Sequence, residues 1–158
     1  GHVHQLETAV RLIRKGLYTG PLVLNYVAIG GGAAGFNPAD LIEFVRRTPP
    51  GSVLTIESAM RAVAPMNAIA IALGLHVRVG IEDNLWGRKG ERMTSVQQIE
   101  QAVRQARELG RSVATGQQAR EIYKLGEWYG SADETIDRLG MAPNRKPGQV
   151  GFTVPGRV

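Results

Sequence analysis

A chain of 158 residues is long enough for one domain with a sizeable core. Hydrophobic residues make up 43% of it and charged residues 21%, as in an ordinary soluble globular protein. The absence of cysteine excludes disulfides and thiolate metal sites. The longest apolar run, Ala62–Leu75, is too short to span a bilayer and contains Pro65 and Asn67. We therefore expect a cytoplasmic protein without a membrane partner.

The formal charge of +5 does not by itself indicate a nucleic-acid partner. Cations at the carboxyl end of a helix complement its macrodipole. Much of the positive charge falls at such positions in two predicted helices: Arg11, Arg14, Lys15, Arg46 and Arg47. No aromatic residues are interleaved with basic ones at a spacing typical of base recognition. We therefore expect no nucleic acid among the partners.

The first third of the chain alternates between helix and strand patterns. Apolar residues recur at helical spacing through Gly1–Gly16, and the final glycine marks the end of that helix. Pro21–Ile29 is a strongly apolar strand that leads into the glycine-rich loop Gly30–Gly35. An Asn-Pro pair then opens a helix that runs from Asn37 to about Arg47, with proline at its first position.

The same alternation continues to residue 125. The expected elements are a strand at Ser52–Glu57, a helix at Ala62–Leu73, a strand at His76–Ile81, a helix at Val96–Leu109 capped by Thr94 or Ser95, an extended piece at Val113–Thr115 and a helix at Gln117–Lys124. Short connections between alternating strands and helices predict right-handed βαβ units and a parallel sheet. Three strands alone leave apolar sheet edges exposed, which proteins avoid. We therefore expect the chain to be part of a larger barrel or sheet.

The segment His76–Asn84 (HVRVGIEDN) carries the strongest functional signal. As a strand it places Val77, Val79 and Ile81 on one face, and His76, Arg78, Gly80 and Glu82 on the other. Helices covering the apolar face would leave the charged face toward an enclosed space. The carboxyl ends of parallel strands are where α/β proteins place their chemistry.

Two charged residues of this segment are separated by four positions. Along a strand, Arg78 and Glu82 lie roughly 13 Å apart, too far to pair, so each is expected to need a separate partner. Buried charges without partners cost several kcal/mol each, so such groups are usually kept to meet a ligand or a metal. An internal salt bridge is the alternative interpretation. His76 is expected to be a core or base-layer residue, because it is about 20 Å from Glu82 along a strand.

The loop Gly30–Gly35 matches the dinucleotide-binding pattern G-x-G-x-x-G. It follows a predicted strand, and Glu57 ends the next strand where a ribose-binding carboxylate belongs. Against this interpretation, the segment Phe36–Pro38 delays the helix beyond the third glycine. A loop that approaches a phosphate or carboxylate of another kind is the competing hypothesis, because amides at a helix start attract anions.

The stretch Gly74–Trp86 (GLHVRVGIEDNLW) resembles the β-keto acid cleavage enzymes, which are zinc-dependent (β/α)8 TIM barrels, and the similarity extends over Gly1–Leu125. The resemblance implies an α/β fold, the carboxyl-terminal half of such a barrel, with parallel strands six to eight and flanking helices preceded by one further helix. Residues 126–158, with their glycines and prolines, are expected to form an irregular C-terminal arm.

The same resemblance implies roles for individual residues. Glu82 matches a zinc ligand, Asp83 the general base, and Arg78 the arginine that holds the substrate carboxylate. Substrate-binding positions implied by the glycine loop and the EDN motif are Gly30, Gly31, Gly32 and Asn84. The implied reaction condenses a β-keto acid with acetyl-CoA to give acetoacetate and a new CoA thioester, so the chain is expected to be an acetyl-transferring enzyme that cleaves a carbon–carbon bond.

The expected zinc site is incomplete within this chain. The family's other zinc ligands form an H-x-H pair on an early strand, and His2 and His4 fall instead where a helix begins. Because three protein ligands are typical, the remaining Zn²⁺ ligands are expected outside the chain, and catalysis only when the missing half is supplied. The chain is expected to pair with that half or to form a homo-oligomer. A dinucleotide-binding oxidoreductase fragment and a non-catalytic half-barrel remain alternatives.

Overall fold

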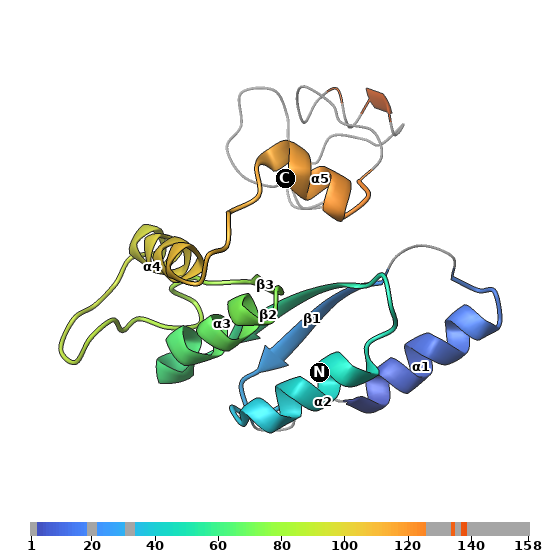
Figure 1. Cartoon of the computed structure of the whole chain (residues 1–158), viewed down its shortest axis with the longest axis horizontal. Helices are drawn as coiled ribbons and strands as arrows, with labels where there is room; N and C mark the ends of the chain where they lie inside the picture. The colour runs from blue at the N-terminus through green and yellow to red at the C-terminus, as the bar shows by residue number, and fades with distance from the viewer. Residues whose placement is uncertain (1–2, 19–21, 31–33, 126–133, 135–136, 139–158) are drawn as a thin grey trace, which may run out of the picture. The chain divides into compact units, whose positions relative to one another are not determined.

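The computed structural model describes residues 3–18, 22–30, 34–125, 134 and 137–138 (Figure 1). The chain divides into two units, Gly1–Lys124 and Leu125–Val158. Most of the expected C-terminal arm, residues 126–158, lies outside the described residues, as do Gly31 and Gly32. Within the described residues, no helix is both long and apolar enough to cross a membrane.

The first unit is an α/β structure with a parallel sheet, as predicted. Its three strands, in the spatial order β1-β2-β3, are β1 (Val23–Ala28), β2 (Val53–Ser58) and β3 (His76–Val77). The helices of the described part are α1 (Val3–Arg14), α2 (Pro38–Arg47), α3 (Val63–Ala72), α4 (Ser95–Glu108), α5 (Gly116–Ile122) and the 3-10 turn η1 (Met60–Ala62). The described strands form an open sheet rather than a closed barrel.

Local capping chemistry explains why the helix boundaries were predictable. Asn37 precedes α2, and its side chain accepts a hydrogen bond from the Ala39 amide at 3.0 Å. Thr94 caps α4 in a capping box with Gln97, in which each side chain binds the other residue's amide. Gly110 follows this helix with a φ of 68°, the left-handed conformation that favours glycine.

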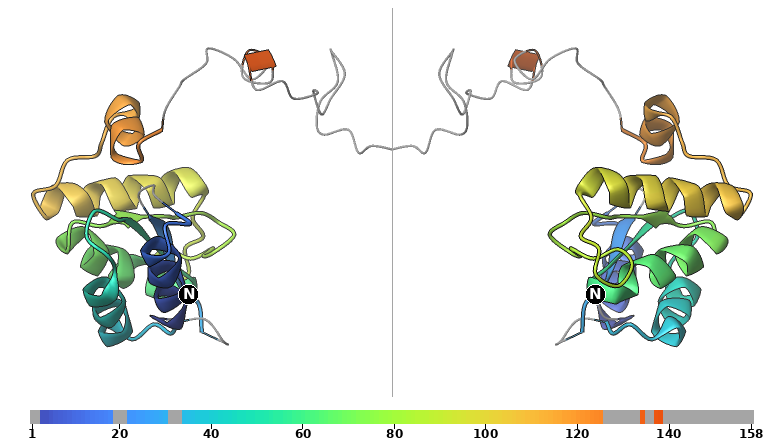
Figure 2. Two further views of the ribbon diagram at one scale, coloured as in Figure 1. Left: turned by 90° about the vertical axis from the view of Figure 1, so that its right-hand side faces the viewer. Right: turned by 90° about the vertical axis from the view of Figure 1, so that its left-hand side faces the viewer.

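The core lies between the sheet and its helices. α1 packs beside α2, and α4 lies alongside α3 (Figures 1 and 2). Strand residues Tyr26 and Ile56 join helix residues of α2 and α3 in one buried cluster, which includes Leu41, Phe44, Met66 and Ala70. Alternate residues of β1 and β2 point to the opposite face of the sheet, which carries Asn25, Thr55 and Glu57 together with valines. Asn25 pairs in register with Thr55, and Val27 with Glu57.

The third strand is shorter than predicted. Hydrogen bonding continues one residue past β3, since the Arg78 amide donates to the Ile56 carbonyl at 2.8 Å, and the chain then turns. The amides of Asp83 and Asn84 both donate to the Gly80 carbonyl at 3.2 Å. The prediction that residues alternate between two faces of a strand as far as Ile81 is therefore wrong beyond Arg78. The Ile81 side chain, predicted to lie on the apolar face, is exposed. The extended piece predicted at residues 113–115 forms no strand.

Tyr26 has a buried hydroxyl that finds no hydrogen-bond partner among the described residues. Burial, with a smaller contribution from the Asp40 charge, raises the pKa of Tyr26 from 10.0 to about 12. We expect Tyr26→Phe to raise the free energy of unfolding by about 1 kcal/mol, because no unsatisfied polar atom is then buried. Because the pKa of Tyr26 is higher in the folded protein than in the unfolded chain, its ionisation leaves the free energy of unfolding unchanged below pH 10.0. As the pH rises from there through about 12, ionisation of the unfolded chain lowers the free energy of unfolding.

Urea unfolding of the two proteins checks the Tyr26 prediction. At neutral pH the phenylalanine variant should have the higher midpoint, and above pH 10.0 the advantage should grow, because only the wild-type chain ionises at this position. A variant that is less stable than the wild type at neutral pH would show that the hydroxyl has a partner and is not a cost.

Candidate active site

The charged residues at the carboxyl ends of β2 and β3 gather around one guanidinium group. Arg78 follows β3 directly, and its Nη1 forms an ion pair with Glu57 of β2. Its Nη2 lies 2.7 Å from Glu82 Oε1 and 4.0 Å from Asp83 Oδ2. Together with Asn25 of β1, these residues form what we call the Arg78 cluster. The structure therefore brings Arg78, Glu82 and Asp83 together at the sheet edge where parallel strands end.

The expectation that Arg78 and Glu82 are too far apart to pair is wrong. It assumed an extended strand, whereas the turn beginning at Gly80 folds Glu82 back toward the guanidinium. Gly80 leaves room for this contact, since a Cβ added there would collide with the Glu82 carboxylate and displace it. The Glu82 side chain is 56% exposed, yet it lies on the same side of the sheet as Arg78.

Glu57 is the member of the cluster whose role the sequence did not indicate. Its carboxylate is buried, and Oε2 accepts a hydrogen bond from Asn25 Nδ2 at 2.6 Å. The strand register brings it close to Arg78, because Ile56 pairs with Val77 and the next residue of each strand follows. The contact between Glu57 and Arg78 could have been identified only from the register of β2 against β3.

The three carboxylates differ in how readily they hold a proton. Burial alone would raise the pKa of Glu57, but hydrogen bonds from Arg78 and Asn25 outweigh it and lower the value. Its own backbone amide and then Arg78 lower the pKa of Glu82. Burial raises the pKa of Asp83, and the nearby Arg78 charge only partly opposes this. Asp83 is therefore the carboxylate of the cluster most disposed to accept a proton.

The backbone around Asp83 is tied to the turn after β2. The Met60 amide donates to the Asp83 carbonyl at 2.9 Å, and Met60 has a left-handed φ of 55°. That conformation is unfavourable for a residue with a side chain. The contact links the carboxyl ends of β2 and β3 and so helps to place Asp83 beside Arg78.

Comparison with known proteins decides the family. The family model described as beta-keto acid cleavage enzyme matches residues 2–125. A 3-keto-5-aminohexanoate cleavage enzyme of Acetoanaerobium sticklandii is 39% identical over 123 residues, covering 77% of this chain and 45% of the relative. The chain belongs to the β-keto acid cleavage enzyme family. The family resemblance noted in the sequence is thereby confirmed.

Two further relatives match a similar share of the chain. The 3-keto-5-aminohexanoate cleavage enzyme of Fusobacterium nucleatum is 36% identical and covers 76% of this chain and 44% of the relative. A 3-dehydrocarnitine:acetyl-CoA trimethylamine transferase of Rhizobium meliloti is 31% identical, covering 74% of this chain and 39% of the relative. The chain thus spans less than half the length of these relatives.

Asn84 and the glycine loop, both predicted to bind substrate, form hydrogen bonds within the chain. Both polar atoms of the Asn84 side chain bind the backbone of Trp86, with Nδ2 donating to the carbonyl at 2.6 Å and Oδ1 accepting from the amide at 3.0 Å. Gln98 of α4 donates a hydrogen bond to the Asn84 carbonyl, and Asn84 thus connects the loop after β3 to α4. In the glycine loop, the Gly30 amide donates to the Ala34 carbonyl at 3.0 Å.

The dinucleotide alternative is not supported by the geometry. It assigns Glu57 to a ribose hydroxyl, but both oxygens of that buried carboxylate already bind side chains of the chain itself. In addition, α2 begins at Pro38, beyond the third glycine of the pattern, so the glycine does not lie in the first turn of the helix.

The residues present do not make a zinc site by themselves. Nowhere in the described part of the chain do three or more His, Cys, Asp or Glu side chains gather in an arrangement that could hold a metal ion. Glu82 is exposed and accessible, but it is a single donor next to a cation, and three protein ligands are typical of a catalytic zinc site. No chemical step through zinc follows from this chain alone.

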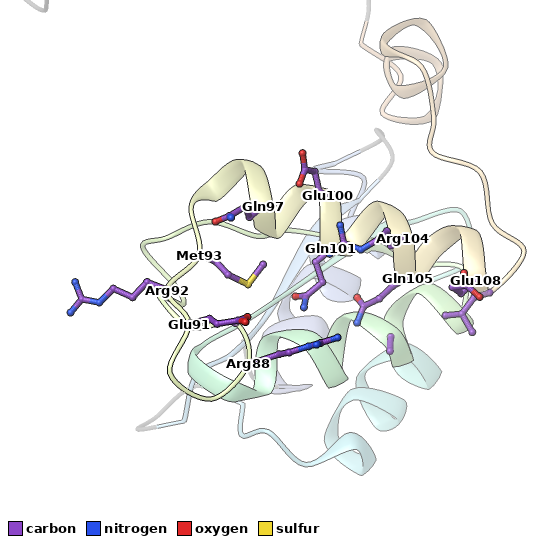
Figure 3. A pocket seen from close by; sticks show the side chains of 13 residues that line it. Arg88, Glu91, Arg92, Met93, Gln97, Glu100, Gln101, Arg104, Gln105 and Glu108 are labelled. Carbon is purple, nitrogen blue, oxygen red and sulfur yellow. The ribbon is translucent and has the colours of Figure 1, made fainter.

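A groove lies apart from the Arg78 cluster, none of whose residues lines it. The groove, of about 910 Å³, runs between α3, α4 and the loop at residues 87–93 (Figure 3). Residues of both charges line it, including Arg88, Glu91, Arg104 and Glu108. Because side chains of both signs line it, the groove offers no single charge preference.

Proposed function

We propose that this chain provides the substrate-carboxylate and proton-transfer part of a β-keto acid cleavage enzyme. The proposed reaction condenses a β-keto acid with acetyl-CoA and gives acetoacetate and the CoA thioester of the remaining acyl group. The observation that carries the proposal is the Arg78 cluster, in which one guanidinium meets the carboxylates of Glu57, Glu82 and Asp83. A guanidinium suits recognition of a planar carboxylate, and a neighbouring carboxylate supplies a base.

Two residues have direct roles in this proposal. Arg78 binds the carboxylate of the β-keto acid through its exposed edge, where Nη2 now meets Glu82. Asp83 Oδ2 takes a proton from the carbon between the two carbonyl groups of the substrate. Its raised pKa suits this role, because a base is most effective when its pKa lies nearer the working pH. Gly30, Gly31, Gly32 and Asn84 are proposed to border the substrate.

We also propose that Zn²⁺ binds between this chain and the missing half of the barrel. Glu82 is proposed to contribute one ligand, and the remaining ligands are proposed to come from outside this chain. The exposure of the Glu82 side chain supports this role, since the carboxylate can be reached from the open side of the sheet. When bound, zinc would act as a Lewis acid that stabilises negative charge on the substrate oxygen.

The proposed architecture is the carboxyl-terminal half of a (β/α)8 barrel, in which β1, β2 and β3 are the sixth, seventh and eighth strands. Its support is an apolar surface next to the unpaired edge of β3. Val96 and Ile99 of α4 are 63% and 52% exposed, and a hollow lined by Leu75, Val77 and Val103 lies between that helix and the strand. A further strand and helix, from the missing half or from a second copy, would cover this surface.

The proposed substrates follow the relatives' names. Two relatives are named for 3-keto-5-aminohexanoate, one for 3-dehydrocarnitine and one, from Paraburkholderia graminis, for 3,5-dioxohexanoate. The last two names also include acetyl-CoA. We propose a β-keto acid with acetyl-CoA for this chain as well. We also propose that the protein is cytoplasmic and that residues 126–158 form a C-terminal arm.

A chimeric enzyme tests the function directly. The amino-terminal half of the Acetoanaerobium sticklandii relative would be joined to Gly1, and acetoacetate and CoA thioester would be measured with acetyl-CoA and each of these three β-keto acids. We expect turnover with at least one acid and none with the joined half alone. A folded chimera that binds zinc but forms no acetoacetate would contradict the proposal. Stable assembly without zinc or activity would favour the non-catalytic half-barrel.

A further inference from the structure

The Glu57 carboxylate is a buried charge that the proposed reaction does not use. Its side chain is 10% exposed, and both of its oxygens are engaged, one by Arg78 Nη1 and the other by Asn25 Nδ2 at 2.6 Å. A carboxylate is removed from water at a cost that only good partners offset. Its position on β2, paired with Val27 of β1, makes it one of the least movable members of the Arg78 cluster.

The two ends of the Arg78 guanidinium meet unlike partners. Nη1 contacts Glu57, which is buried and lies within the sheet. Nη2 contacts Glu82, whose side chain is 56% exposed and belongs to a turn. The Arg78 side chain is itself 42% exposed, so burial alone does not hold it in one rotamer. Nη1 is therefore the nitrogen that pairs with a carboxylate on a strand of the sheet, whereas Nη2 pairs with the exposed Glu82 and lies 4.0 Å from the mostly buried Asp83.

We infer that Glu57, supported by Asn25, is a positioning residue that anchors Arg78 through Nη1 and keeps the Nη2 edge directed toward a ligand carboxylate. The identity of that ligand rests on the proposed function, whereas the anchoring itself does not. A long, flexible side chain binds a carboxylate more tightly when one edge is already fixed, because less freedom is lost on binding. The lowered pKa of Glu57, caused by its hydrogen bonds from Arg78 and Asn25, keeps the anchor charged at neutral pH.

Nitrogen-15 NMR of the arginine side chains in the full chain tests the anchoring without any ligand. Pairing of Nη1 hinders rotation of the guanidinium, so wild-type Arg78 should give separate Nη signals. In Glu57→Gln these signals should merge, because a neutral amide holds the group more weakly. The matched control is Glu43→Gln, which removes a carboxylate paired with Arg46 and Arg47 on α2 and should leave the Arg78 signals unchanged.

A second variant keeps the experiment decisive if the first fails to fold. Asn25→Ala removes the support of Glu57 but retains its charge, so the Arg78 signals should broaden without merging fully. Thermal unfolding of each variant separates loss of structure from loss of anchoring. Arg78 signals that remain separate in both folded variants, or in Asn25→Ala where only that variant folds, would overturn the inference.

Titration with acetoacetate, used as a simple β-keto acid, links the anchor to ligand binding. We expect its dissociation constant to rise about tenfold in Glu57→Gln and to stay at the wild-type value in Glu43→Gln. If wild-type Arg78 binds no acetoacetate while its signals still merge in Glu57→Gln, the anchoring stands and the proposed function fails. If acetoacetate binds equally to both proteins, Glu57 does not position Arg78 and the inference fails.

Discussion

In the chimeric enzyme, Glu82→Gln is expected to abolish turnover of β-keto acids. The substitution preserves the size of the side chain and its ability to accept a hydrogen bond from Arg78, but it removes the charged donor proposed for zinc. A bound metal stabilises transition-state charge by several kcal/mol, so a loss of about 10³-fold or more is expected. The zinc content of the purified protein should fall in parallel with the rate of acetoacetate formation.

The matched control for this variant is Glu91→Gln, because Glu91 is also an exposed carboxylate and lines the groove between α3 and α4, away from the Arg78 cluster. It should retain both wild-type zinc content and wild-type activity. Activity of Glu82→Gln close to that of the control would count decisively against Glu82 as a metal ligand and against the family mechanism in this chain.

Helix boundaries were predictable from the sequence because their causes are local. Asn37 and Pro38 define the start of α2, and Thr94 and Gln97 define the start of α4, within four residues in each case. The parallel sheet was predictable from the alternation of strand and helix patterns. The end of β3 was not, because the turn at Gly80 interrupts a run of β-branched residues whose alternation continues through Ile81.

The candidate site was predictable only in part, for a related reason. Arg78, Glu82 and Asp83 are close in sequence, and their resemblance to a family motif indicated that they act together. Glu57 is 21 residues from Arg78, and a non-local strand register brings the two into contact. Periodicity identifies which face of a strand a residue occupies, but it does not show which residue stands beside it on the next strand. For this reason Glu57 matched the position of a ribose-binding carboxylate in the sequence, whereas in the structure it is the ion-pair partner of Arg78.

Asp83→Asn in the chimeric enzyme tests the proposed base. The Asp83 carboxylate is mostly buried, and its Oδ2 has no hydrogen-bond partner within the described part of the chain, so an isosteric amide fits the same space without breaking a hydrogen bond at that atom. An amide cannot accept a proton from the substrate, and general base catalysis typically contributes about 10²- to 10⁴-fold. We expect kcat to fall by about 10³-fold, within that range, while KM for the β-keto acid changes little.

The separation of kcat from KM identifies the role of Asp83, because Arg78 and not Asp83 is proposed to hold the substrate carboxylate. Zinc content should stay at the wild-type level, since Glu82 remains in place, and this distinguishes the variant from Glu82→Gln. A large rise in KM with unchanged kcat would assign Asp83 to binding instead. A kcat within tenfold of the wild-type value would mean that another group takes the proton, and Glu57, paired on both oxygens, is poorly placed to be that group.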